Sequence, residues 1–451
     1  MSEDAGSYRL DISPSATIST RSAEKIVASA TTFLVVMILV GIHTGVAIMK
    51  DGELVVPFIV SFIAAIGIIV IHAGAIKAEV LQWFVRFIFV VVALATITSA
   101  LDGDFSGHIR ASAFFIYNVL IGYATFLGFS MMGLRRIETT FFWFAIVLVV
   151  GAGLEIYGPI RPLSDWFRDT FDKWHSTIYG NDFRDMANYG AVRPKFFASE
   201  PSVLGMSTAF CLAFWVCARR RPDFRFLVQA VCLLGAALFF VRSPTILAAP
   251  VAYLLVRVAT SKPTNKREKY LRLLVPTFYM IIIAVMPLLA LYAVFEFKDT
   301  PRYMLTTSFF ERAIAPFLVV IRVLIGYPLW GIGLGHDDAL TALVLKVFRE
   351  VGALTLVPRA AMATIGSDIC NAFWEFWIVF GVVGGAIMLW MFSRFLRILR
   401  VPVSPIVVFC IVSGTFWQGF GSVNMPVAWF SIFSIAALCS LLWENDKAAS
   451  V

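Results

Sequence analysis

Residues 139–158 read TTFFWFAIVLVVGAGLEIYG, and this run of 20 residues contains one charged side chain, Glu155. A helix of about 20 residues is about 30 Å long, which matches the hydrocarbon thickness of a bilayer. Similar runs recur along the chain, in which 59% of the 451 residues are hydrophobic and 15% are charged. A single water-soluble core cannot hide that much apolar surface, so the composition predicts an integral membrane protein.

The length of the apolar runs favours helices over a β-barrel, whose strands are alternating stretches of about 10 residues. We therefore predict an all-α fold, a polytopic transmembrane helical bundle of about 12 spans. The spans are expected near residues 26–49, 54–76, 80–101, 112–134, 139–158, 202–218, 226–241, 244–259, 273–295, 372–393, 405–423 and 427–443. The seventh and eighth meet at Val241-Arg242-Ser243-Pro244, so they form either one helical hairpin or one broken span, which would lower the count by one.

Lysine and arginine in short connections are retained on the cytoplasmic side of a membrane. With twelve spans, all the basic connections and both tails fall on that side; these connections hold Lys77, Arg135 and Arg136, residues 219–225, residues 262–272, and Arg394, Arg397 and Arg400. This distribution accounts for the formal charge of +8 without nucleic-acid binding. Both termini are predicted to be cytoplasmic.

The chain divides into a single transmembrane domain, residues 26–443, between cytoplasmic tails at 1–25 and 444–451. The first tail is polar and rich in Ser and Thr, so it is not a cleavable signal peptide. The six cysteines lie in or at the edge of predicted spans without metal-ligand spacing. We therefore expect no disulfide framework, no metal and no cofactor.

Two long connections, 159–201 and 296–371, fall on the outer face and are expected to be functional periplasmic loops. Each contains a short amphipathic pattern, which predicts a helix lying at the membrane interface. The apolar positions are Trp166, Phe167, Phe171, Trp174 and Ile178 in the first loop, and Leu340, Leu343, Val344, Val347, Phe348 and Val351 in the second. A structural lid packed on the bundle is an equal alternative.

Charged side chains in or beside the spans concentrate at the outer end, and they include Glu155, Glu200, Arg242 and Glu375. Charge at membrane depth is costly, so it indicates a functional site. These residues predict a polar cavity that opens to the outside under the two loops.

The segment from Arg193 to Gly205, RPKFFASEPSVLG, precedes a span and resembles the Arg, Phe, Glu-Pro, Gly pattern of the O-antigen ligase and polymerase superfamily. Residues 331–336, GIGLGH, are similar to the Gly-x-Gly run of that family, and nine residues separate Asn371 from the sequence GVVG at 381–384. The resemblance covers most of the chain.

The resemblance implies that the protein transfers a glycan from a polyprenyl-diphosphate-linked oligosaccharide to an acceptor hydroxyl at the periplasmic face of a bacterial inner membrane. It implies no metal, and it implies a chain-length regulator and a flippase as partners. A diphosphate leaving group develops negative charge, which guanidinium groups stabilise. The candidates are Arg193, Arg242 and Arg312, with Arg302 and Arg322 behind them; surface or headgroup contact is the alternative for the last two.

Attack by a sugar hydroxyl needs a general base, for which Glu200, His336 and Asp368 are candidates, together with Asp337 and Asp338. Glu200 is equally suited to stabilise the start of the following helix through the helix dipole. The glycines of 331–335 either supply positive φ angles or bring backbone amides near a phosphate.

Ligases of this family have a His directly before the Asn, and Cys370 occupies that position here. A buried thiol is a poor base, so we predict a polymerase that joins repeat units of a surface polysaccharide. The close alternative is a ligase in which His336 takes the missing role. A secondary transporter is the third class, but the chain has no evident internal repeat and its charges lie at one face instead of the midplane.

Overall fold

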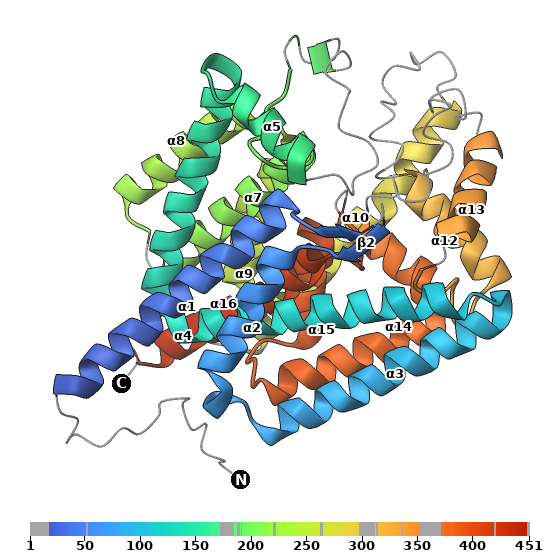
Figure 1. Ribbon diagram of the computed structural model, residues 1–451, viewed down its shortest axis with the longest axis horizontal. Helices are drawn as coiled ribbons and strands as arrows, with labels where there is room; N and C mark the ends of the chain where they lie inside the picture. Colours follow the sequence, from blue (N-terminus) through green and yellow to red (C-terminus); the bar gives the residue numbers. More distant parts are fainter. Residues whose placement is uncertain are drawn as a thin grey trace.

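The computed structural model describes residues 18–50, 53–171, 185–186, 190, 192–219, 222–261, 265–296, 312, 314–335, 337–350, 371–418 and 421–448. These residues form a bundle of helices with one small β-hairpin (Figure 1). The longer helices are α1 (Ile18–Thr44), α3 (Ala78–Asp102), α4 (Phe105–Tyr157), α7 (Pro201–Ala218), α8 (Phe224–Val241), α10 (Lys266–Glu296), α14 (Ala372–Ile398) and α16 (Pro426–Ala448). The shorter ones are α2 (Ile59–Ile71), α5 (Arg161–Phe171), α9 (Ala248–Thr260), α12 (Ala315–Gly326), α13 (Asp337–Glu350) and α15 (Pro405–Thr415), with 3-10 turns η1 (Ala73–Ala75) and η2 (Pro244–Leu247).

Eight helices of the described residues are long and apolar enough to cross a membrane. Their bounds are Glu24–Thr44, Ala78–Ala100, Phe105–Tyr157, Pro201–Ala218, Phe224–Val241, Lys266–Leu289, Ala372–Ile398 and Pro426–Glu444. The prediction of a helical chain with several membrane-length helices is thereby confirmed. The figure of about 12 spans stays a prediction, since α4 covers two predicted spans and α2, α9, α12 and α15 are shorter apolar helices.

The helix α4 turns sharply at Gly133, whose φ of 73° is far from helical geometry. Two residues that are twelve positions apart in a straight helix lie about 18 Å apart along its axis. The rings of Phe129 and Phe141, on either side of Gly133, have centroids only 5.4 Å apart. The halves of α4 therefore correspond to the two predicted spans near 112–134 and 139–158.

The helices α8 and α9 form a hairpin, which was one of the two alternatives for residues 226–259. At the start of α8, the ring of Phe226 lies 5.0 Å from that of Trp215 near the end of α7. At the end of α9, the Arg257 guanidinium donates a hydrogen bond to the backbone carbonyl of Arg219, directly after α7. Because both far ends return to the same end of α7, the chain reverses in the turn at Arg242, whose φ is 54°.

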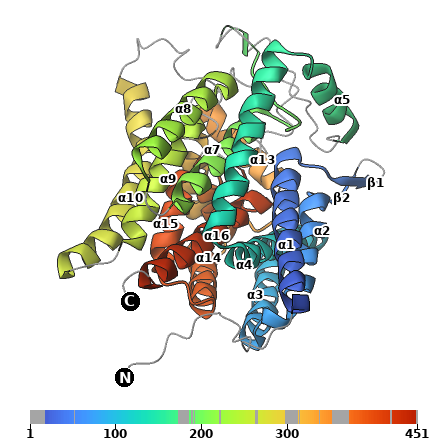
Figure 2. The same cartoon turned by 90° about the vertical axis from the view of Figure 1, so that its left-hand side faces the viewer.

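Two apolar runs are helical over less of their length than the sequence indicates. In the run near 54–76, residues Glu53–Val56 form strand β2, which pairs antiparallel with β1 (Ile48–Lys50), and only Ile59–Ile71 are helical. Figure 2 shows α1 and α2 side by side, with this hairpin beside the upper end of α1. In the run near 405–423, α15 ends at Thr415, and the side chains of Trp417, Gln418 and Ser422 after it hydrogen-bond to α16, to Asn371 and to Glu375 of α14.

Aromatic rings and close helix approaches hold the bundle together. A Cβ added at Gly122 of α4 would lie 2.5 Å from Phe433 and 3.0 Å from Trp429, so α4 and α16 approach too closely for any larger residue. The ring of Trp429 lies 5.1 Å from that of Phe115 and 4.5 Å from that of Phe392. Packing of this kind drives helix association where lipid is as apolar as the side chains.

Candidate functional site

The segment from Arg193 to Gly205, which the sequence singles out, leads into α7 through a strained backbone. Phe196 and Phe197 have φ values of 42° and 66°, in the left-handed region that residues other than glycine rarely adopt. Such conformations persist where the surrounding structure imposes them, and they cluster at functional sites. The contacts around these two residues show what imposes them here.

Buried hydrogen bonds from three helices fix this backbone. The Glu155 carboxylate, at the end of α4, accepts the backbone N–H of Lys195 at 2.9 Å and also that of Phe196. The backbone N–H of Phe197 donates to the Ser164 hydroxyl of α5 at 3.0 Å. Glu155, the charged residue of the run 139–158, is therefore a structural acceptor for the segment.

The third contact comes from His43 at the end of α1. Its Nε2 lies 2.7 Å from the carbonyl oxygen of Phe196, and its Nδ1 lies 3.1 Å from the hydroxyl of Ser207 in α7. A carbonyl oxygen accepts hydrogen bonds and donates none, so Nε2 carries the proton and the Ser207 hydroxyl donates to Nδ1. This histidine joins α1, α7 and the strained segment, and nothing in the sequence pattern pointed to it.

Glu200 is the N-cap residue of α7, and its side chain makes no capping hydrogen bond. Its Oε2 accepts instead from the hydroxyl of Ser202 at 2.7 Å. The half-buried carboxylate is therefore positioned beside the first turn without satisfying a backbone N–H. Glu200 therefore forms no capping hydrogen bond with α7. Its carboxylate can still interact with the helix dipole at this position, which was one of the two roles considered for it.

Arg242 lies beside the same turn. A Cβ added at Gly205 would lie 2.3 Å from the hydroxyl oxygen of Ser243, so the residue after Arg242 touches the first turns of α7. The Nη1 atom of Arg242 is buried and has no hydrogen-bond partner among the described residues. The structure therefore brings two of the predicted residues, Glu200 and Arg242, to the same end of α7.

Arg193 is paired within its own loop. Its Nε and Nη2 atoms each lie 3.0 Å from Oδ1 of Asp185, a fully buried carboxylate. This ion pair ties the beginning of the segment to the residues that precede it.

The other predicted arginines and bases lie elsewhere or outside the described residues. Arg322 is exposed on α12 and pairs with Glu350 of α13 at 2.6 Å, which favours its surface alternative. Arg312 is half-buried, and its backbone carbonyl accepts a hydrogen bond from Asn371 at 2.9 Å. Three predicted residues, His336, Asp368 and Arg302, lie outside the described residues, as do the side chains of Asp337 and Asp338.

The glycine run 331–335 packs against a break in α14 at Gly381, whose φ is 61°. The backbone N–H groups of Ile332 and Gly333 donate to the carbonyls of Ile378 and Val379, both at 3.0 Å. A Cβ at Gly331 would lie 2.4 Å from the carbonyl oxygen of Ile378. The glycines thus allow close backbone contact and positive φ angles. The N–H groups of Ile332 and Gly333 already donate to carbonyls of α14, so they are not free to bind a phosphate.

A second group of polar residues, which sequence reasoning did not assemble, lies at the start of α14. This polar cluster comprises Asn118, Asn371, Glu375, Gln418, Ser422 and Asn424. The Glu375 carboxylate accepts from the Ser422 hydroxyl at 2.6 Å and from the Val423 N–H at 2.8 Å. In the sequence, only Asn371 and Glu375, one helical turn apart, pointed to this polar cluster. Its other members are far away in the sequence, because they come from α4 and from the connection between α15 and α16.

The polar cluster contains hydrogen-bonding atoms without a partner among the described residues. They are Nε2 of Gln418 and the Oδ1 atoms of Asn118 and Asn424, while Asn118 itself is fully buried. A buried polar atom left unsatisfied costs about 1–3 kcal/mol. These atoms are available to hydrogen-bond a polar ligand or bound water.

The helix α7, which follows the Arg193–Gly205 segment, also packs against the connection that carries part of the polar cluster. The ring of Phe210, in the middle of α7, stacks on that of Phe416 with centroids 4.3 Å apart, and Gln418 follows two residues later. Within the described residues, no three His, Cys, Asp or Glu side chains gather in an arrangement that could hold a metal ion. The region offers carboxylates, amides and guanidinium groups for chemistry.

No protein-family model, no curated protein and no solved structure matches the chain.

Proposed function

We propose that this protein is an inner-membrane glycosyltransferase that joins polyprenyl-diphosphate-linked oligosaccharide repeat units into O-antigen, capsule or exopolysaccharide at the periplasmic face. The observation that carries the proposal is the fixed, strained backbone of the Arg193–Gly205 segment, which has the family-like sequence and leads into the end of α7 that Ser243, the residue after Arg242, also contacts. A segment of this kind keeps reacting groups in one geometry, which is a large part of catalysis by positioning.

In the proposed reaction, an acceptor hydroxyl attacks the anomeric carbon of the lipid-linked glycan while Glu200 takes the hydroxyl proton. The bond between the anomeric carbon and the diphosphate oxygen breaks, and polyprenyl diphosphate leaves with both bonding electrons. Arg242, whose Nη1 has no partner among the described residues, stabilises the charge on the departing diphosphate. Arg193 holds the segment through its ion pair with Asp185.

The orientation of the protein follows from the basic connections. Arg219 pairs with Glu138 at 2.9 Å and receives the Arg257 side chain on its backbone carbonyl, so the links after α7, α9 and the kink of α4 meet at one end of the bundle. The positive-inside rule assigns this end to the cytoplasm, with both termini there, and assigns the Arg193–Gly205 segment to the periplasm. A chain-length regulator and a flippase are the proposed partners.

The polymerase is preferred to a ligase because Cys370 occupies the position of the histidine on which family ligases rely. The deciding experiment is a deletion of the gene, followed by gel analysis of surface glycan with core lipid and free polymer separated. Single repeat units on the core without a ladder are the expected result. Lipid-linked polymer beside a bare core would identify a ligase, and unchanged glycan would refute both activities and favour a transporter.

A further inference from the structure

The helix α10 begins at the end of the bundle that the basic connections assign to the cytoplasm. Its first turns are basic, since Lys266 and Arg267 are exposed and Arg272 is half-buried. The side-chain oxygen of Asn265 accepts the backbone N–H of Glu268 at 2.9 Å and so caps the helix. Figure 2 shows this beginning of α10 at the lower left, at the same end of the bundle as the C-terminus.

Arg272 has no acceptor within the part of the protein that the structure describes. Its Nε and Nη2 atoms are buried without a hydrogen-bond partner. The carboxylates of Glu268, one turn earlier, and of Glu444 form no ion pair with it. Its third nitrogen, Nη1, is not among the buried atoms, so it is the one that faces outward. The counter-anion of this half-buried cation therefore comes from outside the protein.

The neighbouring arginines at this end each have an acceptor. Arg219 pairs with Glu138 at 2.9 Å, and Arg257 donates to the backbone carbonyl of Arg219. Withdrawing a charged group from water is costly unless the group is paired. Arg272 thus differs from its neighbours in a way that a bound anion would explain.

The ring of Trp443, in α16, holds the Arg272 guanidinium from one side. The Cζ atom of Arg272 lies 5.4 Å from the centroid of that ring. An aromatic ring attracts a cation through its face, whereas the N–H groups of a guanidinium lie in the plane of the group. The stacked ring therefore orients Arg272 and leaves its outward N–H groups to an anion.

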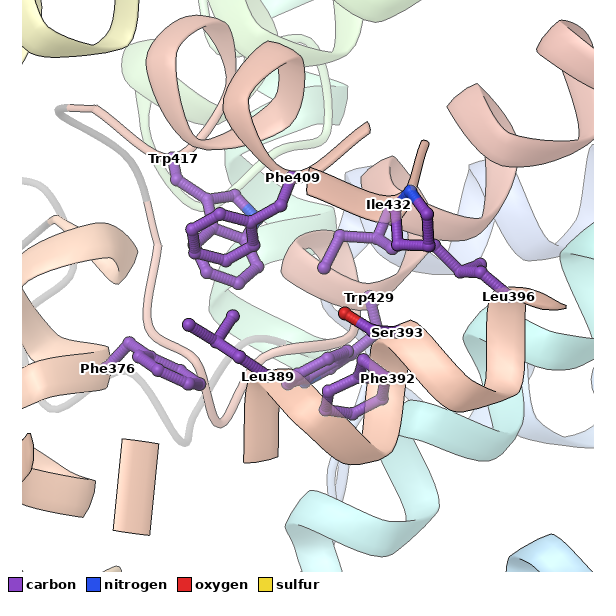
Figure 3. Close-up of a pocket in the computed structure, with 10 residues that line it drawn as sticks. Phe376, Leu389, Phe392, Ser393, Leu396, Phe409, Trp417, Trp429 and Ile432 are labelled. Atoms are coloured by element: carbon purple, nitrogen blue, oxygen red, sulfur yellow. The ribbon is translucent and has the colours of Figure 1, made fainter. Parts of the chain in front are cut away.

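Trp443 belongs to a helix that is held firmly, whereas Arg272 belongs to one that is open to lipid. Figure 3 shows Trp429 of α16 among the rings of Phe392, Phe409 and Trp417, and the space between them has room for about one water molecule. In the most apolar stretch of α16, 89% of the residues are buried, against 17% in that of α10. The helix α16 therefore presents Trp443 from a fixed position to a site that lipid can reach.

The surroundings of Arg272 favour a lipid over a soluble anion. Leu271, Leu273 and Leu274, beside it, are exposed, and such side chains on a membrane-length helix face lipid. Arg272 lies about 8 Å along the axis from the exposed Arg267, which is close to the thickness of one headgroup layer of a bilayer, about 5–8 Å. The long side chain of Arg272 can therefore reach lipid phosphates from the inner side of that layer.

We propose that Arg272, stacked on Trp443, binds the phosphodiester of an anionic phospholipid of the cytoplasmic leaflet between α10 and α16. The headgroup phosphate accepts from Nη1, and the acyl chains lie along the exposed leucines of α10. The charges of Lys266 and Arg267 favour an anionic lipid over a zwitterionic one. The site lies at the opposite end of the bundle from the Arg193–Gly205 segment, and it does not depend on the proposed function.

The test is native mass spectrometry of the full-length protein, released from nanodiscs that contain equal amounts of phosphatidylglycerol and phosphatidylcholine. We expect phosphatidylglycerol to stay bound to the wild-type protein and phosphatidylcholine to be lost. Equal retention of the two lipids overturns the proposal without any variant. Inorganic phosphate, added to delipidated protein, distinguishes the source of the anion. If it raises the unfolding midpoint as much as phosphatidylglycerol does, the site takes an anion from solution and the lipid assignment is wrong.

Three variants make the test specific to this site. Arg272→Gln should lower the amount of retained phosphatidylglycerol at least about tenfold, because a charge-assisted hydrogen bond is lost. Trp443→Leu keeps the net charge and should lower retention as well. Arg267→Gln is the matched control, since this exposed arginine of the same helix contributes only general attraction and its loss should have a smaller effect. Equal losses from the two arginine variants, or full retention by Trp443→Leu, overturn the proposal. Unfolding midpoints in lipid-free detergent establish that each variant is folded.

Discussion

The Glu155 carboxylate of α4 accepts the backbone N–H of Lys195 at 2.9 Å, across 40 residues of sequence. It also accepts the N–H of Phe196, so one buried side chain satisfies two donors of a strained turn, of which that of Lys195 is buried. Nothing else in the described residues replaces it, since Ser164 and His43 serve the neighbouring N–H and carbonyl groups.

Replacing Glu155 with Ala should therefore lower stability strongly. Two N–H groups, one buried and one partly buried, lose their acceptor, which costs about 2–6 kcal/mol in total. A lowered midpoint of thermal unfolding in detergent, together with loss of polymer, is the expected result. Glu138→Ala is the matched control, because the pair of Glu138 with the partly exposed Arg219 is worth less than about 1 kcal/mol. Equal effects of the two substitutions would show that Glu155 does not hold the segment.

His43 and Ser207 should contribute to the free energy of unfolding in a coupled way, because they hydrogen-bond to each other and His43 also bonds to the Arg193–Gly205 segment. His43→Ala removes both the donor to the Phe196 carbonyl and the acceptor for the Ser207 hydroxyl, whereas Ser207→Ala removes only the second bond. We expect the first substitution to lower the unfolding midpoint more, and the double variant to be less destabilised than the sum of the two, by about 0.5–3 kcal/mol. Strict additivity in this double-mutant cycle would mean that the two side chains are not coupled.

Replacing Arg242 with glycine removes a guanidinium group without adding backbone strain. Its left-handed φ of 54° suits glycine better than arginine, by about 1 kcal/mol. Arg242→Gly should keep or raise the unfolding midpoint while the polymer ladder collapses to single repeat units, because the diphosphate loses its partner. The measurement combines thermal unfolding with the glycan gel.

Arg400 provides the matched control for this substitution. It is an exposed arginine with a φ of 57° in the basic connection after α14, away from the proposed site. Arg400→Gly should have the same effect on the unfolding midpoint and should leave the ladder intact. A normal ladder from Arg242→Gly would remove that residue from the proposed site.

The sequence predicts the helical membrane class and several elements because apolar length and charge are local properties. The two halves of α4, the helix α7 after the Glu-Pro pair, and the short helices α5 and α13 coincide with residues predicted to be helical. The interfacial location of α5 and α13 stays a prediction, and Trp174, Ile178 and Val351 of their patterns lie outside the described residues. The sequence could not decide whether α8 and α9 form a hairpin or one broken span, because the hairpin depends on the contact between Arg257 and Arg219, 38 residues apart. Local patterns carry no information about such pairs.

The candidate site was predictable only in part for the same reason. Glu200 and Arg242 were recognised as costly charges, and the structure places both at the start of α7. His43 was missed because a single histidine at the end of an apolar helix has no distinguishing pattern. The polar cluster was missed because the residues after Thr415 read as a continuation of an apolar span, whereas their side chains hydrogen-bond with Asn371 and Glu375, which are more than 40 residues away in the sequence.

The break in α14 should not tolerate an added methyl group. Gly381 combines φ 61° with ψ −165°, a conformation available essentially only to glycine, and a Cβ there would lie 2.4 Å from the backbone nitrogen of Gly331. Gly381→Ala should therefore lower the unfolding midpoint and detach the glycine run. Gly235→Ala in α8 is the control, since a Cβ there meets nothing within 4 Å and alanine favours the helix by about 0.5–1 kcal/mol. Purification of both variants in parallel decides the matter: a stable Gly381→Ala protein with normal polymer would mean that the break in α14 plays no part in folding or synthesis.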